Sequence, residues 1–444
     1  MTDRPVVVTD PVQTQERLWL RENQLFVLLT IVIGVLAGLS AVLFHLAIEA
    51  TSRWVFGFEP SNGRRFVVPA LMSLGAGVLL AKVFPDVRGS GIPQTKQAYH
   101  LSGGVISWRV PIGKFITGVM CVGGGHSMGR EGPSVQIGAG LASAIGQWLK
   151  LSPARVRDLV PVGAAGALSA AFNTPVAAVI FALEEIIGDM NARLLGSAVA
   201  ASVASVIVAR SILGNEPLFH VPAYELAHPA ELGAYALLGI VGGLVSVAFS
   251  HILLRWRRAW LQLPAGSRIL QPAMGGVLIG ALLVYEPAVA GVGYEYVDQA
   301  LNGEMLLMSM LMLGALKILA TITSYVSGNA GGIFAPTLFI GAMTGGAVGH
   351  LVNLYAPFPT GEVGAYALVG MGALFAGIIR APLTSVFMIF ELTQDHEILV
   401  PLMVANMLSL MLSRRLQPLP IYQALLHQDG VALPVDQPRH LTGS

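Results

Sequence analysis

Three glycine-rich stretches interrupt long apolar segments, and each leads through a proline into an apolar helix. They are Gly89-Ser90-Gly91-Ile92-Pro93, Gly129-Arg130-Glu131-Gly132-Pro133 and Gly331-Gly332-Ile333-Phe334-Ala335-Pro336. Proline is favoured in a first helical turn because its missing N–H would have no intrahelical partner there. The remaining free N–H groups and the positive end of the helix dipole attract an anion without a buried full charge. Three such helix starts predict a weak site for a dehydrated halide, although glycines alone also serve close helix packing.

Glu131 stands at the mouth of the second stretch, where its carboxylate would compete with an anion for the same N–H groups. An ionised carboxylate can occupy the site as a tethered anion, and a protonated one loses that attraction and can swing away. We therefore expect Glu131 to gate the site. The alternative is a glutamate that only complements the helix dipole.

Two adjacent carboxylates, Glu184 and Glu185, end another apolar helix. Consecutive helical residues do not face each other, so the two can differ in role. The internal repeat described below gives Glu184 a counterpart, Glu391, but gives Glu185 none. This asymmetry predicts that Glu184 is structural and that Glu185 has a separate function. The alternative for Glu185 is a solvated glutamate at a helix end.

The composition indicates an integral membrane protein. Of 444 residues, 54% are hydrophobic and only 11% are charged, about half the charged share of a usual soluble domain. The net charge of +1 gives no indication of nucleic acid as a partner. A single cysteine, Cys121, excludes an intramolecular disulfide, and the ten histidines show no metal-ligand spacing. We expect neither a metal nor a cofactor.

A helix that crosses a bilayer needs about 20 apolar residues. Long apolar segments occur at Leu25–Ala50, Val67–Phe84, Leu194–Leu213, Leu232–Leu253, Ile269–Val284 and Met305–Tyr325. Others, including Ile333–Leu354, are short or are broken by glycine, proline or asparagine. Such interrupted segments are typical of a transporter's binding site. Lys114 and Arg380 lie in apolar context, which predicts a structural partner or a contribution to positive potential along a pore.

The chain repeats itself. The segment from Glu131 to Ala139 matches the segment from Phe334 to Ala342 without gaps, in a register that also aligns Lys114 with Lys317. Val162, Pro175 and Glu184 then match Val369, Pro382 and Glu391 at identical spacings. We therefore expect a cytosolic N-terminal tail at 1–24, a first transmembrane repeat at 25–213, a linker at 214–231, a second repeat with a terminal pore helix at 232–428 and a C-terminal tail at 429–444.

Together with Pro420-Ile421-Tyr422, the three stretches resemble the signature elements of the CLC family of chloride channels and proton/chloride antiporters. They occur in the family's order, and the resemblance covers the chain from Leu25 to about Leu426. It is to the prokaryotic type without C-terminal CBS domains. The resemblance implies an all-α polytopic fold of many tilted, unequal helices in two inverted repeats. It also implies a homodimer in the inner (plasma) membrane of a prokaryote.

The resemblance assigns roles residue by residue. Ser90 would offer its hydroxyl, and Tyr422 its phenol, to a central chloride that the backbone N–H groups of Ile333 and Phe334 also face. N–H groups near Arg130 and Glu131 would form the outer part of the path. In the family, serine at the Ser90 position goes with chloride preference and proline with nitrate. Glu131 would be the external gate and a proton carrier, and Glu185 the internal point at which protons reach the path.

Two other functions compete with proton/chloride exchange. A passive, gated chloride channel on the same fold would also conduct chloride, and Glu185 favours proton exchange over it, because family channels typically carry an apolar residue there. Gly125-His126-Ser127-Met128-Gly129 fits the G-x-S-x-G pattern of serine hydrolases. A true nucleophile elbow follows a strand, whereas this motif follows an apolar helix, so we do not expect an enzyme.

Overall fold

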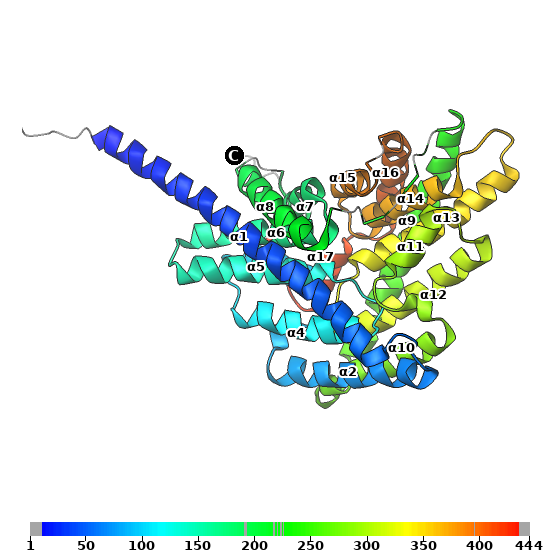
Figure 1. Ribbon diagram of the computed structural model, residues 1–444, viewed down its shortest axis with the longest axis horizontal. Helices are drawn as coiled ribbons and strands as arrows, with labels where there is room; N and C mark the ends of the chain where they lie inside the picture. The colour runs from blue at the N-terminus through cyan, green and yellow to red at the C-terminus, as the bar shows by residue number, and fades with distance from the viewer. Residues whose placement is uncertain are drawn as a thin grey trace, which may run out of the picture.

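The computed structural model describes residues 11–434 except 191–192, 216–217, 220, 223, 225 and 395, and describes side chains from residue 26 onward, residue 265 excepted. Within these residues the protein is built of helices and loops, and its only β pairing is two isolated bridges between loops. The predicted all-α class is confirmed. Helices α4 to α8 lie on one side of the view in Figure 1 and α9 to α16 on the other, with α17 between them.

The helices have unequal lengths. Their bounds are α1 Pro11–Phe56, α2 Asn62–Lys82, α3 Ile92–Leu101, α4 Arg109–Gly123, α5 Glu131–Trp148, α6 Pro153–Phe172, α7 Pro175–Phe181, α8 Leu195–Leu213, α9 Glu231–Leu261, α10 Gln271–Tyr285, α11 Tyr294–Leu301, α12 Leu307–Val326, α13 Phe334–Tyr355, α14 Val363–Ile378, α15 Pro382–Thr393, α16 Leu399–Leu416 and α17 Ile421–Gln428. A π-helical turn, η2 (Ala182–Ile187), continues α7, and 3₁₀ turns include η1 (Pro85–Val87), η3 (Ala265–Ile269) and η4 (Pro287–Val289).

Seven segments of the described chain are helical, long and apolar enough to cross a bilayer. They lie in α1, α2, α8, α9, α12, α13 and the stretch Leu399–Gln428. The predicted span Ile269–Val284 is wrong, because the helix there, α10, has only 15 residues and stops two residues before Pro287. The predicted interruption of Ile333–Leu354 is also wrong. Its glycines are accommodated in the continuous 22-residue α13, which is mostly buried against neighbouring helices.

The predicted boundaries meet the helices as follows. The N-terminal tail 1–24 is helical from Pro11, where α1 begins, and residues 1–10 lie outside the described residues. In the predicted linker 214–231, the described residues are non-helical up to Ala230, and Glu231 is already the first residue of α9. The C-terminal tail 429–444 follows α17, and residues 435–444 lie outside the described part of the chain.

The element order of the first half recurs in the second. Helices α1 to α8 correspond in order to α9 to α16, and η1 corresponds to η4. Matching glycine pairs join equivalent helices, since Gly138 of α5 meets Gly163 of α6 and Gly341 of α13 meets Gly370 of α14. A β-carbon on any of these four would collide with the partner's backbone carbonyl. Only glycine permits so close an approach of two helices.

Two buried lysines at equivalent positions fix the loops that precede α3 and α11. The Lys114 ammonium donates to the carbonyls of Val87 (2.8 Å) and Gly89 (2.5 Å). Lys317 donates likewise to the carbonyls of Val289 (3.1 Å) and Gly291 (2.9 Å). Their buried charges therefore have a structural use, one of the two uses expected for Lys114.

Arg380 fixes the loop between α16 and α17. Its guanidinium donates to the carbonyls of Ser413 (3.0 Å), Pro418 (2.9 Å) and Gln417. Three backbone acceptors on one side chain hold the start of α17 in place, and with it Tyr422, the second residue of that helix.

Candidate functional site

The three glycine-rich loops meet through their backbones. Gly129 donates to the carbonyl of Gly332 (2.7 Å), and Gly332 donates back to Gly129 (2.8 Å). Gly331 donates to the carbonyl of Gly89 (3.2 Å). Loops separated by up to about half the chain therefore converge at one place, and the starts of α3, α5 and α13 converge with them.

Two buried hydroxyl groups lie at this convergence without hydrogen-bond partners. Ser90 and Tyr422 are each 0% exposed, and neither hydroxyl oxygen is hydrogen-bonded to any described group. A β-carbon on Gly132 would lie 2.6 Å from Ser90 Oγ, so glycine is needed where α5 passes this serine. A buried unpaired hydroxyl is destabilising, and an anion would satisfy both groups.

Ile333 and Phe334 lie at the start of α13 and are fully buried. The Phe334 ring packs against three phenylalanine rings from three other helices, with centroid distances of 5.0 Å to Phe172, 5.7 Å to Phe181 and 4.6 Å to Phe375. This packing fixes the direction of the first N–H groups of α13, which have no carbonyl partner within the helix.

Glu131 is the first residue of α5 and is 0% exposed. The hydroxyl of Tyr294 donates to Glu131 Oε1 at 2.7 Å, whereas Oε2 has no hydrogen-bond partner among the described groups. A β-carbon on Gly129 would collide with Oε2 and stand 3.2 Å from the backbone nitrogen of Ala335. The carboxylate therefore lies beside the N-terminus of α13, where an anion would compete for the same N–H groups.

The adjacent glutamates of η2 have different partners. Glu185 is 4% exposed and forms an ion pair with Lys96 of α3, Nζ to Oε1 2.9 Å. Glu184 points elsewhere and accepts hydrogen bonds from the backbone of Leu383 and Thr384 at the start of α15. The two glutamates therefore have different partners, as their predicted difference in role requires, and the alternative of a solvated Glu185 is wrong, because α3 and η2 enclose the carboxylate. A π-helical turn often marks a functional position in a helix.

Arg130 borders a cavity of about 720 Å³ that His45, Glu49 and Tyr294 also line. Its guanidinium carbon lies 5.9 Å from the centre of the Tyr294 ring, and Nη1 contacts His45 Nδ1. His45 in turn contacts Glu49 at 3.2 Å. We refer to this space as the Arg130 cavity, and it borders Tyr294, the hydrogen-bond partner of Glu131.

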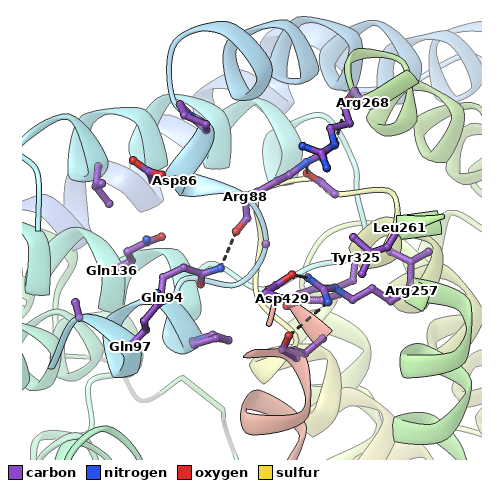
Figure 2. Close-up of a pocket in the computed structure, with 18 of the residues that line it drawn as sticks. Asp86, Arg88, Gln94, Gln97, Gln136, Arg257, Leu261, Arg268, Tyr325 and Asp429 are labelled. Carbon is purple, nitrogen blue, oxygen red and sulfur yellow. Dashed lines mark hydrogen bonds and ion pairs between the residues drawn. The ribbon is translucent and has the colours of Figure 1, made fainter. Parts of the chain in front are cut away.

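A second cavity, of about 510 Å³, borders Gly89 and Tyr325. Figure 2 shows Arg88, Arg257 and Arg268 around it, and we refer to it as the Arg88 cavity. Arg257 is paired with Asp429 at 2.7 Å, whereas Arg88 donates to the carbonyl of Arg268 at 2.9 Å. Burial, and after it the charges of Arg268 and Arg257, lower the pKa of Arg88. Three arginines outnumber the two aspartates, Asp86 and Asp429, in its lining, so the cavity has a net positive charge, and it borders Gly89 next to Ser90.

Two residues of the site, Lys96 and Tyr294, were not predicted from the sequence. Lys96 lies 89 residues before its partner Glu185, so no local pattern connects them. Tyr294 had a usable signal, because Gly291-Val292-Gly293 before it matches Gly89-Ser90-Gly91 of the first repeat.

The hydrolase motif has a structural explanation. Ser127 is fully buried, and its hydroxyl pairs with Thr321 at 3.1 Å. The neighbouring His126 contacts the hydroxyls of Ser73 and Ser324 and not that of Ser127. A buried serine paired with a threonine has no base to activate it. Among the described residues, no group of three His, Cys, Asp or Glu side chains could hold a metal ion.

Comparison with known proteins places the chain among anion transporters. The family model described as "voltage gated chloride channel" matches residues 72–414. The H(+)/Cl(-) exchange transporter ClcA of Vibrio cholerae is 32% identical over 414 residues, which cover 90% of this chain and 88% of the relative. ClcA of Salmonella typhimurium is 32% identical over 409 residues, 89% of this chain and 86% of the relative.

Solved structures agree. A slow cyanobacterial Cl⁻/H⁺ antiporter has a TM-score of 0.83 at 26% identity, and the match covers 91% of this chain and 97% of that one. A CLC-type fluoride/proton antiporter has a TM-score of 0.76 at 22% identity, covering 91% and 98%. At 22% identity, the match to the fluoride/proton antiporter shows a shared fold alone.

Proposed function

This chain belongs to the voltage-gated chloride channel (CLC) family, and on that premise we propose that it exchanges chloride for protons across the plasma membrane of a prokaryote. It is an integral membrane protein and a transporter, not an enzyme. The observation that carries the proposal is the position of the Glu131 carboxylate. It lies beside the start of α13 with one oxygen unpaired, at a site that also presents two unpaired hydroxyls.

The chloride path in this proposal runs between the Arg88 cavity and the Arg130 cavity. A chloride that arrives from the Arg88 cavity meets the hydroxyls of Ser90 and Tyr422 and the N–H groups of Ile333 and Phe334. N–H groups at Arg130 and Glu131 continue the path. Hydroxyl and amide donors attract a halide without a buried full charge, so the halide is released readily.

The proton path uses two buried carboxylates. Glu131 carries the proton at one end, because a protonated carboxyl no longer competes with chloride for the N–H groups. Glu185 receives the proton at the other end. The chloride path does not include Glu185, so the two paths separate between Glu131 and Glu185. The Glu185–Lys96 ion pair supports exchange over passive conduction, since it keeps an ionisable carboxylate within the buried part of the protein.

The family also implies a homodimer of two such chains, each with its own path. Apolar side chains are exposed at helical spacing on α8 at Val199, Val203 and Ile207 and on the equivalent α16 at Met403, Met407 and Met411. We propose that the two repeats, 25–213 and 232–428, contribute these equivalent stripes to the subunit contact. Cross-linking in a membrane tests this, and a chain that remains monomeric at high protein-to-lipid ratio would contradict it.

The test of function is whether a chloride gradient drives protons uphill across liposomes that contain the purified protein. Coupled proton movement supports exchange. Chloride movement with no proton movement would instead identify a passive, gated channel on the same fold.

A further inference from the structure

Contacts of the residues around it hold Tyr294 beside Glu131, the proposed gate. Tyr294 is the first residue of α11 and follows Gly293, which has φ +79°. Lys317 holds the preceding loop through the carbonyl of Gly291 at 2.9 Å. The Phe219 and Tyr294 rings pack edge to face, with centroids 5.5 Å apart and planes at 90°. Backbone and ring are thus both fixed, and the hydroxyl is aimed at Glu131.

The hydroxyl of Tyr294 has no counterpart in the first repeat. Because Gly291-Val292-Gly293 matches Gly89-Ser90-Gly91, the counterpart of Tyr294 is Ile92, which has no polar atom in its side chain. Ile92 is fully buried and fills space. The packing role of this position therefore needs no hydroxyl, and the bond to Glu131 requires a separate explanation.

We propose that Tyr294 is a positioning residue for the gate, whose hydroxyl holds the ionised Glu131 carboxylate against the start of α13. The inference rests on the proposed function of Glu131. A phenol that donates to a carboxylate stabilises the ionised form, since hydrogen bonds to charged groups are stronger than neutral ones. It therefore opposes two events, protonation of Glu131 and its replacement by chloride.

The pair is surrounded by few ionisable groups. Among the described residues, those that face it, its loop or the adjoining Arg130 cavity are Arg130 at the start of α5, His45 and Glu49 on α1, Arg65 on α2, Lys317 on α12 and Tyr422 on α17. Lys317 is bound to backbone carbonyls, and Arg130 contacts His45. Among the described residues, Tyr294 is the one side chain that hydrogen-bonds to the carboxylate of Glu131.

The test is the pH dependence of chloride flux in liposomes for Tyr294→Phe, which removes one oxygen and keeps the ring. The pH of half-maximal flux should rise by about one unit, because a hydrogen bond to a charged group changes an equilibrium by roughly tenfold or more. The chloride concentration for half-maximal flux should fall, because chloride then displaces a less firmly held carboxylate. A second variant, Tyr294→Leu, should shift the pH profile in the same direction.

Two controls separate positioning from a general effect on folding. Tyr296→Phe removes a hydroxyl two residues along α11 and should leave the pH profile unchanged. In a Glu131→Gln background, adding Tyr294→Phe should leave the pH profile unchanged, since no ionised carboxylate remains to hold. A Tyr294→Phe profile that coincides with that of the unmodified protein would overturn the proposal.

The role of Tyr294 and the exchange of chloride for protons are tested by different measurements. Chloride-driven proton movement by the unmodified protein is measured first, and its absence would overturn exchange. The pH profile of chloride flux still tests the role of Tyr294 in that case, because a gate formed by Glu131 responds to pH in a channel as well.

Discussion

Glu184 and Glu391 each cap a helix of the opposite repeat. Glu184 accepts from the backbone of Leu383 (3.2 Å) and Thr384 (2.8 Å) at the start of α15. Glu391, on α15, accepts from Val176 (2.9 Å) and Ala177 (2.7 Å) at the start of α7. A contact that is repeated with its partners exchanged is the sign of a two-fold axis. The two halves of the chain therefore meet around such an axis at α7 and α15.

We expect Glu184→Ala and Glu391→Ala to lower stability while chloride and proton movement stay coupled. Each change leaves two first-turn N–H groups without an acceptor and costs about 1–2 kcal/mol. Thermal unfolding and proton uptake measured on the same preparations check this, with Glu304→Ala at an exposed site as the control. Loss of coupling without loss of stability would show that these carboxylates carry protons.

The neighbouring Glu185 should behave in the opposite way. We expect Glu185→Gln to reduce chloride-driven proton movement by at least about tenfold, because general acid–base groups typically contribute more than that. Chloride flux should continue, since Glu185 is not among the groups that meet chloride. Proton movement at the unmodified rate in this variant would show that Glu185 serves only to pair with Lys96.

Lys96→Gln tests the ion pair itself. The change leaves a buried carboxylate without its cation, and breaking such a pair costs about 3–5 kcal/mol. Protonation of Glu185 at low pH removes the unpaired charge, so the loss of stability should be larger at pH 8 than at pH 5. Adding Glu185→Gln should restore most of the stability. An equal loss at both pH values would contradict a pairing of charges.

Much of the site could be predicted from the sequence because its signals are local. A glycine loop, a proline in the first turn and a helix are contiguous, and each of the three stretches does start a helix at the convergence, although α3 is half polar and not apolar as predicted. The repeat assigned a structural role to Glu184 for a physical reason, since its counterpart Glu391 occupies the equivalent place.

The rest of the site and of the fold depends on contacts between residues that are far apart in the sequence. Lys96 and Glu185 meet only because α3 packs on η2. The predicted span at α10 and the predicted interruption of α13 were wrong because the length of an apolar segment does not by itself decide where a helix ends. Pro287 shortens the first, and close packing on α14 lets the second continue through its glycines.

Ser90 should determine which anion the path prefers. We expect Ser90→Pro to shift preference from chloride towards nitrate, as proline at this position does in the family. Competition of nitrate with radioactive chloride uptake measures the shift, and Ser90→Ala serves as the control for loss of the hydroxyl alone. Unaltered selectivity in Ser90→Pro would exclude Ser90 as the selective group.

Arg268 should speed the arrival of chloride at the Arg88 cavity. We expect Arg268→Gln to lower the initial rate of flux about twofold to threefold at low ionic strength, because one fewer positive charge attracts the anion. The difference should disappear in high concentrations of an inert salt, which screen exposed charges. Arg268→Lys keeps the charge and should retain the rate. A difference that persists in high salt would point to a structural effect.

The most direct test of the central claim is proton movement driven by chloride in liposomes. The voltage is clamped with potassium and an ionophore, a chloride gradient is imposed, and external pH is recorded for the unmodified protein and for Glu131→Gln. We predict uphill proton movement in the unmodified protein and chloride flux without proton movement in the variant. Chloride flux without proton movement in the unmodified protein would contradict exchange and identify a channel.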